Sequence, residues 1–99
     1  MARFDVYRHP DENGFLLDVQ ANVLARLNTR VVVPLLPVAS SPKPMDRLNP
    51  ILEVGTTPVV LMTHYLSAVP TSILSEPVTN LESRRNEIVA ALDFLQQGF

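Results

Sequence analysis

The chain has 99 residues, of which 46% are hydrophobic and 18% charged, so we expect residues 1–99 to form one globular domain. A formal net charge of −2 gives no electrostatic reason for direct nucleic-acid binding, and the lack of cysteine excludes disulfides and thiolate metal sites, which fits a cytoplasmic protein. Charges near the start and the lack of an apolar run of about 20 residues argue against a signal peptide or a membrane-spanning helix.

The first 38 residues have the pattern of antiparallel β-structure. "RFDVYRH" alternates, the turn formers "PDENG" follow, and "FLLDVQ" resumes the pattern, which predicts a hairpin over residues 3–20. "ANVLARLNT" is expected to be an irregular loop. "RVVVPLLPV" is rich in β-branched residues and nearly continuously apolar, which favours a central strand buried on both faces. Because Pro34 lacks an N–H, this strand must bulge or lie at an edge there.

Residues 39–50 contain three prolines and show no periodicity, so a loop is expected. After this loop, "ILEVG" and "PVVLMTHYL" on either side of "GTTP" predict a second hairpin. "SAVPTSILSEPV" predicts one or two short strands interrupted by Pro70 and Pro77.

The end of the chain is predicted to be helical, because Thr79 to Gln97 contain neither proline nor glycine. Thr79 and Glu82 have the spacing of a capping box. One apolar stripe is expected, made of Ile88, Ala91, Leu92, Leu95 and Phe99. The predicted fold class is therefore mostly β with one C-terminal α-helix.

The sequence offers little catalytic chemistry. His9 and His64 do not have metal-ligand spacing, so no metal site is expected. Thr63 adjoins His64, but neighbours on a strand point to opposite faces, and the three glycines form no phosphate-binding loop. The residues alone predict a binding domain with no catalytic residues and no cofactor.

Several other residues are given structural interpretations. Arg30 is expected to pair with a buried or interface carboxylate. Met45 and Met62 are expected to fill the core. Arg84 and Arg85 are expected on a solvated face.

The C-terminal end of the predicted helix should be electronegative. No cation follows Arg85, whereas Asp93, the α-carboxylate and the helix dipole all add negative character. Two interpretations of the last residue remain open. In one, Gly98 closes a Schellman motif and Phe99 folds back on Phe94. In the other, Phe99 is an exposed apolar anchor that docks into a basic groove of a partner.

Five segments, "FDVY", "LDVQANVL", "TRVVVPL", "LSAVPTSILSEPVTNL" and "RRNEIVAALDFLQQGF", resemble the CcdB family in order and spacing across essentially the whole chain. The resemblance implies an SH3-like antiparallel β-barrel, a CcdB/MazF-like fold, that forms a homodimer. It also implies the toxin of a type II toxin–antitoxin module, which binds the A subunit of DNA gyrase and traps the gyrase–DNA cleavage complex. A cognate CcdA-like antitoxin would neutralise it, and contact with DNA would occur only through the toxin–antitoxin complex that represses the operon.

The resemblance also assigns binding residues. The implied gyrase-binding residues are Ala21, Val23, Leu24, Asp93, Gln97, Gly98 and Phe99. Gln97 stands where the best-known member has a tryptophan that stacks against gyrase arginines, and glutamine offers no π face, so affinity should fall or the contact be rebuilt. An acidic antitoxin tail is expected to use Arg84 and Arg85.

Two alternatives remain open. A homologue that has lost gyrase poisoning would serve antitoxin binding and autoregulation. A MazF-like ribonuclease would share the barrel, but it would want a basic groove, and eight Lys plus Arg stand against ten Asp plus Glu with no basic run.

Overall fold

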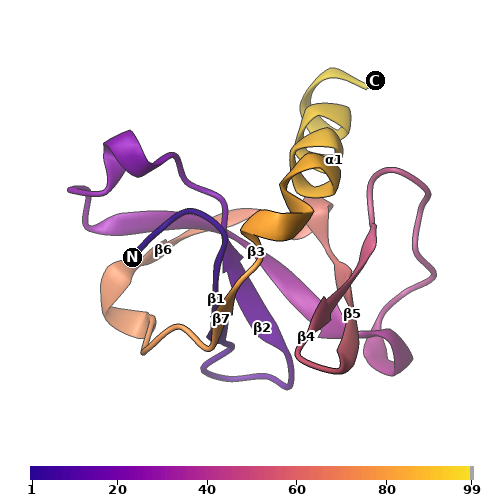
Figure 1. Cartoon of the computed structure of the whole chain (residues 1–99), viewed down its shortest axis with the longest axis horizontal. Coiled ribbons are helices and arrows are strands. Elements are labelled where there is room, and N and C mark those ends of the chain that lie inside the picture. The colour runs from indigo at the N-terminus through magenta and orange to yellow at the C-terminus, as the bar shows by residue number, and fades with distance from the viewer. Residues whose placement is uncertain (99) are drawn as a thin grey trace.

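A computed structural model describes residues 1–98 as one curled antiparallel sheet with a helix at the C-terminal end (Figure 1). The helix α1 spans Arg85–Gln97, and five short 3-10 turns lie between the other elements. The strands are β1 (Asp5–Arg8), β2 (Phe15–Asp18), β3 (Thr29–Pro37), β4 (Ile51–Val54), β5 (Thr57–Leu61), β6 (Ser67–Pro70) and β7 (Thr79–Asn80). The predicted fold class, mostly β with one C-terminal α-helix, is confirmed. Within the described part of the chain, no helix combines the length and apolar character that crossing a bilayer requires.

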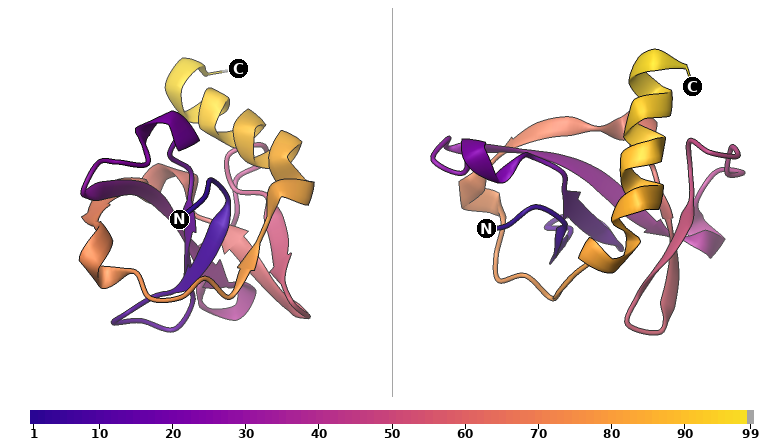
Figure 2. Two further views of the ribbon diagram at one scale, coloured as in Figure 1. Left: turned by 60° about the vertical axis from the view of Figure 1, so that its left-hand side comes forward. Right: turned by 45° about the horizontal axis from the view of Figure 1, so that its top comes forward.

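The sheet has the strand order β4-β5-β3-β2-β1-β7, with β6 also paired to β3. Both predicted hairpins are confirmed, since β1 pairs with β2 and β4 pairs with β5, all antiparallel. The nine-residue β3 is the central strand, with β2 along one side and β6 and then β5 along the other. Figure 2 shows that the sheet curls into a half-barrel and that α1 lies across one side of it.

Pro34 lies where β3 changes partners. The Val19 N–H donates to the Val31 carbonyl at 3.0 Å, so odd-numbered residues of this stretch direct their backbone groups toward β2. The backbone groups of Pro34 therefore point away from β2. Along β3, Pro34 lies between the end of the pairing with β6 and the start of the pairing with β5. Its carbonyl accepts the Met62 N–H at 2.9 Å, while no donor is needed from its nitrogen. The missing N–H thus falls at a local edge, as expected.

Two apolar clusters cover the two faces of the sheet. The main core joins the sheet to α1 through the fully buried Ile88 and Ala91. A smaller cluster on the other face contains Tyr7, Leu16, Val32 and Leu74. Leu92 of the predicted helical stripe is half-buried, and Leu95 is 38% exposed.

The two methionine predictions have opposite outcomes. Met62 is 1% exposed, so its prediction as a core residue is confirmed, whereas the same prediction for Met45 is wrong because its side chain is 57% exposed. Met45 lies on the loop between β3 and β4, outside both clusters.

The predicted start of the helix at Thr79 is wrong. Thr79 and Asn80 form β7, an edge strand paired with β1, and α1 begins only at Arg85. The predicted capping box of Thr79 and Glu82 is therefore absent; the Asn80 side-chain oxygen accepts the Glu82 N–H instead, at 2.8 Å. Pairing with β1 satisfies the backbone of this segment, so tertiary structure overrides its local helix propensity.

Arg30 pairs with a buried carboxylate, as predicted. Its Nε donates to Asp18 Oδ2 at 2.7 Å, and both side chains are fully buried. Burial raises the pKa of Asp18 above its ordinary value, although hydrogen bonds from the Gln20 backbone and from Arg30 act in the opposite direction.

Candidate partner-binding site

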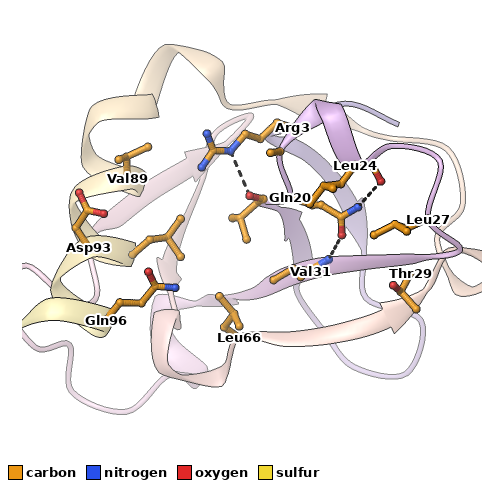
Figure 3. A pocket seen from close by; sticks show the side chains of 13 residues that line it. Arg3, Gln20, Leu24, Leu27, Thr29, Val31, Leu66, Val89, Asp93 and Gln96 are labelled. Atoms are coloured by element: carbon orange, nitrogen blue, oxygen red, sulfur yellow. Dashed lines mark hydrogen bonds between the residues drawn. The ribbon is translucent and has the colours of Figure 1, made fainter.

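A groove of about 390 Å³ lies between residues 19–31 and one face of α1 (Figure 3). Apolar side chains contribute most of its lining, namely Val19, Ala21, Leu24, Leu27, Val31, Leu66, Val89 and Leu92. The polar residues that line it are Arg3, Gln20, Thr29, Asp93 and Gln96. This combination of apolar surface with a few polar groups is typical of a binding surface.

Gln20 holds the loop that forms one wall of the groove. Its side-chain amide donates to the Leu24 carbonyl at 2.9 Å, and its side-chain oxygen accepts the Val31 N–H at 3.0 Å (Figure 3). Asn22 adds a second tie, because its side-chain oxygen accepts the Arg3 N–H at 2.8 Å. These bonds fix the loop after β2, which also contains a 3-10 turn over Asn22–Leu24, and Ala21 and Leu24 line the groove.

Arg3 and Gln20 line the groove but were not predicted from the sequence as part of the site. Gln20 carried a detectable signal: a side-chain amide at the end of a predicted strand can satisfy both a donor and an acceptor of the next loop. Arg3 carried none, because its Nε bond to the Val19 carbonyl, at 3.2 Å, depends on the fold.

The opposite wall is a face of α1. Val89, Leu92, Asp93 and Gln96 recur at helical spacing, which explains why they lie on the same side of the helix. Asp93 is exposed, and Figure 3 shows its carboxylate near Val89 at the helical wall. The lining therefore carries one cation, Arg3, and one anion, Asp93.

The structure brings together some of the residues that the resemblance assigned to gyrase. Ala21 and Leu24 from the loop line the same groove as Asp93 from α1. Val23 does not line the groove and is 89% exposed. Gln97 and Gly98 are exposed at the end of α1, outside the groove lining, and Phe99 lies outside the described residues.

The loop of this site exposes three large apolar side chains. Val23, Leu24 and Leu27 are 89%, 47% and 51% exposed, and all three belong to the segment 21–28. Exposed apolar side chains gathered on one segment are a feature of protein–protein contact sites.

Gly98 ends α1 in a left-handed conformation with φ +79°. Its N–H donates to the Phe94 carbonyl at 2.9 Å, the bond of a simple left-handed cap. In a Schellman motif the Gly98 N–H would bond to the Leu95 carbonyl, and the Phe99 N–H to that of Phe94. Phe99 lies outside the described residues, so both interpretations of its side chain stay open. The last turn of α1 carries no basic side chain, in agreement with an electronegative helix end.

Arg84 and Arg85 are partly exposed and already have acidic partners within the chain. Arg84 pairs with Glu87 at 2.6 Å and also donates to the Ile51 carbonyl at 3.3 Å. Arg85 lies 3.5 Å from Glu82. Their use by an antitoxin stays a prediction.

The histidines have structural contacts. His9 Nδ1 accepts the backbone N–H groups of Asp11 and Glu12, each at 3.1 Å, within the first hairpin turn. Thr63, next to His64, is buried and donates its hydroxyl to the Leu48 carbonyl. Among the described residues, no group of three or more His, Cys, Asp or Glu side chains is arranged to hold a metal ion.

The family model described as CcdB protein matches residues 3–98 of this chain. The match includes both hairpins, the loop with Ala21 and Leu24, and all of α1.

Proposed function

The chain belongs to the CcdB family of toxins from toxin–antitoxin modules, and on this premise we propose that it binds the A subunit of DNA gyrase and traps the gyrase–DNA cleavage complex. One observation carries the proposal for this chain. Residues from the loop after β2 and from α1, far apart in the sequence, line one groove next to the electronegative end of the helix.

In this proposal the protein acts by binding alone. Leu24 contributes affinity by losing its exposed apolar surface, and burying such a side chain fully is worth about 1.5–3 kcal/mol. Asp93 and the C-terminal end of α1 favour a basic partner surface, which speeds encounter and fixes orientation. Gln97 can donate and accept hydrogen bonds but cannot stack as an aromatic ring does, so the loop and Asp93 carry a larger share of the contact.

The remaining partners follow from the same premise. We propose a homodimer, because a two-fold toxin would present two equivalent sites to a two-fold target. A CcdA-like antitoxin would approach the partly exposed Arg84 and Arg85 with acidic residues. DNA would be contacted only by the toxin–antitoxin complex.

The direct test is a cleavage assay. Purified protein is incubated with gyrase, ATP and supercoiled plasmid, and the cleaved linear DNA is measured after detergent and protease treatment. We expect linear DNA to accumulate, and Leu24→Ser to require about tenfold more protein for the same effect, a change of about 1.4 kcal/mol.

Ile73→Ser is the matched control, since Ile73 is 39% exposed and does not line the groove. With this variant, gyrase should produce as much linear DNA as with the unmodified protein. The proposal fails if no linear DNA forms, and the site fails if Leu24→Ser and Ile73→Ser behave alike.

Gln97 favours a second candidate function, a homologue that binds antitoxin and regulates its operon without poisoning gyrase. An exposed glutamine in the last turn of α1 offers no aromatic face to a guanidinium. Gln97→Trp distinguishes the two. If the gyrase–DNA cleavage complex accumulates only with this variant, the second candidate is established. If it accumulates with the unmodified protein, the second candidate is excluded.

A further inference from the structure

The C-terminal part of α1 receives a cation from a different segment of the chain. The guanidinium carbon of Arg47 lies 4.7 Å from the centroid of the Phe94 ring, within the range of a cation–π contact. Arg47 belongs to the loop between β3 and β4, while the last turn of α1 has no basic residue of its own. Arg47 therefore supplies, across the fold, a positive charge that the end of this helix lacks.

The backbone of Arg47 is in an unfavourable conformation. Its φ is +70°, in the left-handed region that glycine adopts freely and bulky side chains seldom do. A glycine would suit this backbone better than an arginine. Because such conformations persist only where the surroundings impose them, the guanidinium contact with Phe94 gives a reason for arginine at this position.

The loop that carries Arg47 is fixed to the body of the protein. Asn49 is 5% exposed; its side-chain oxygen accepts the Met45 N–H at 3.0 Å, and its amide donates to the Leu61 carbonyl at 3.0 Å. The Asn49 N–H closes the same turn by donating to the Met45 carbonyl at 2.9 Å. Thr63 also holds this turn through the Leu48 carbonyl. The turn from 45 to 49 thus has a defined position, from which Arg47 reaches α1.

We propose that Arg47 is a positioning residue for the C-terminal end of α1. Its guanidinium, stacked on Phe94, holds the last turn so that Asp93 and Gln97 keep one arrangement for a partner. The inference deepens the proposed function, and it rests on that function only in taking the helix end as a docking surface.

The first test measures local order without any partner. In Arg47→Gly, which removes the guanidinium and suits the left-handed backbone, the amide protons of Gln97 and Gly98 should exchange about fivefold faster or more. Exchange at Ile88, in the buried part of α1, should stay within about twofold of the unmodified protein. Lys43→Gly is the matched control, because it removes a cation and a long side chain from an exposed position of the same loop. Unchanged exchange at Gln97 and Gly98 in Arg47→Gly would overturn the proposal.

The second test measures binding to a purified fragment of the gyrase A subunit. Arg47→Gly should weaken affinity about tenfold, mainly through faster dissociation, and Arg47→Lys should recover part of the loss because it keeps the charge without the flat guanidinium. Lys43→Gly should bind like the unmodified protein. If the unmodified protein does not bind, the proposed function fails while hydrogen exchange still decides whether Arg47 holds the helix end. Faster exchange with unchanged affinity would overturn the positioning role.

Discussion

Replacing Asp18 with asparagine tests how the fold carries a fully buried charge pair. The Nε and Nη2 atoms of the Arg30 guanidinium both lie against Asp18 Oδ2. Its Nη1 is buried without a hydrogen-bond partner among the described residues, so Asp18 is the carboxylate that balances this charge. In Asp18→Asn a guanidinium would stay buried without a counter-charge.

Leaving one partner of a buried ion pair uncompensated costs about 3–5 kcal/mol. A domain of this size has a free energy of unfolding of about 5–15 kcal/mol, so Asp18→Asn should remove about a fifth of the stability or more. With a urea m-value of about 1.5 kcal/mol/M, the midpoint of unfolding should fall by about 2–3 M. Far-ultraviolet circular dichroism during urea titration measures this midpoint.

Arg30→Met should cost less than Asp18→Asn. A buried carboxyl can take up a proton, and burial already raises the pKa of Asp18, so removal of Arg30 raises it further and leaves a neutral acid. The sign follows from linkage: when the pKa of a group is raised in the folded state, the free energy of unfolding of the protein falls as pH rises through that pKa. Arg30→Met should therefore become less stable, relative to the unmodified protein, as pH rises above the ordinary pKa of an aspartate.

Asp46→Asn is the control, because it makes the same chemical change at an exposed position of the β3–β4 loop. It should shift the urea midpoint by an amount within the error of measurement. The reasoning would be refuted if Asp18→Asn cost less than about 1 kcal/mol, or if Arg30→Met were the more damaging change at neutral pH.

Two further predictions concern a tight turn and a buried phenol. Gly14→Ala should lower the thermal stability of the protein more than Gly55→Ala. Both glycines have positive φ, but only at Gly14 would an added Cβ meet backbone, 2.6 Å from the Leu35 carbonyl oxygen. Equal losses of stability would contradict this. Burial, with help from Asp5 and Asp18, raises the pKa of Tyr7 to about 12, so the stability that its neutral form contributes is lost as pH rises from about 10. The Tyr7 hydroxyl is buried without a hydrogen-bond partner among the described residues, so Tyr7→Phe should lower the free energy of unfolding only slightly at pH 7. The variant should also unfold at higher pH than the unmodified protein, as followed by circular dichroism. Unchanged alkaline unfolding would contradict this prediction.

The β-sheet could be predicted from sequence because its signals are local. Period-two alternation and a cluster of turn formers identified the first hairpin, and the turn "GTTP" between two apolar segments identified the second. The apolar run around Pro34 identified the central strand. The start of α1 could not be predicted in this way. Thr79 and Asn80 lie in a segment that favours helix, yet their pairing with β1 depends on a strand at the other end of the chain.

Single residues of the candidate site could be predicted, but the groove that they form together could not. Resemblance assigned Leu24 and Asp93, but no sequence pattern indicates that the loop after β2 and the middle of α1 line one groove. Arg3 joins them through a bond to the Val19 carbonyl that exists only in the folded chain. The prediction that Met45 lies in the core was wrong for a related reason. Its hydrophobic character predicts burial, whereas the turn closed by Asn49 leaves its side chain at the surface.

The buried ion pair and the binding loop are connected through Gln20. Asp18 accepts a hydrogen bond from Arg30 with one carboxylate oxygen and from the Gln20 N–H, at 3.0 Å, with the other. The Gln20 side chain then binds the Leu24 carbonyl, so an unbroken set of hydrogen bonds runs from the core to the groove. This connection explains how a loop with exposed apolar side chains keeps a defined shape, because its anchoring groups are buried while its binding groups are not. Substitutions at Leu24 should therefore alter binding at nearly constant stability, whereas substitutions at Asp18 should alter both.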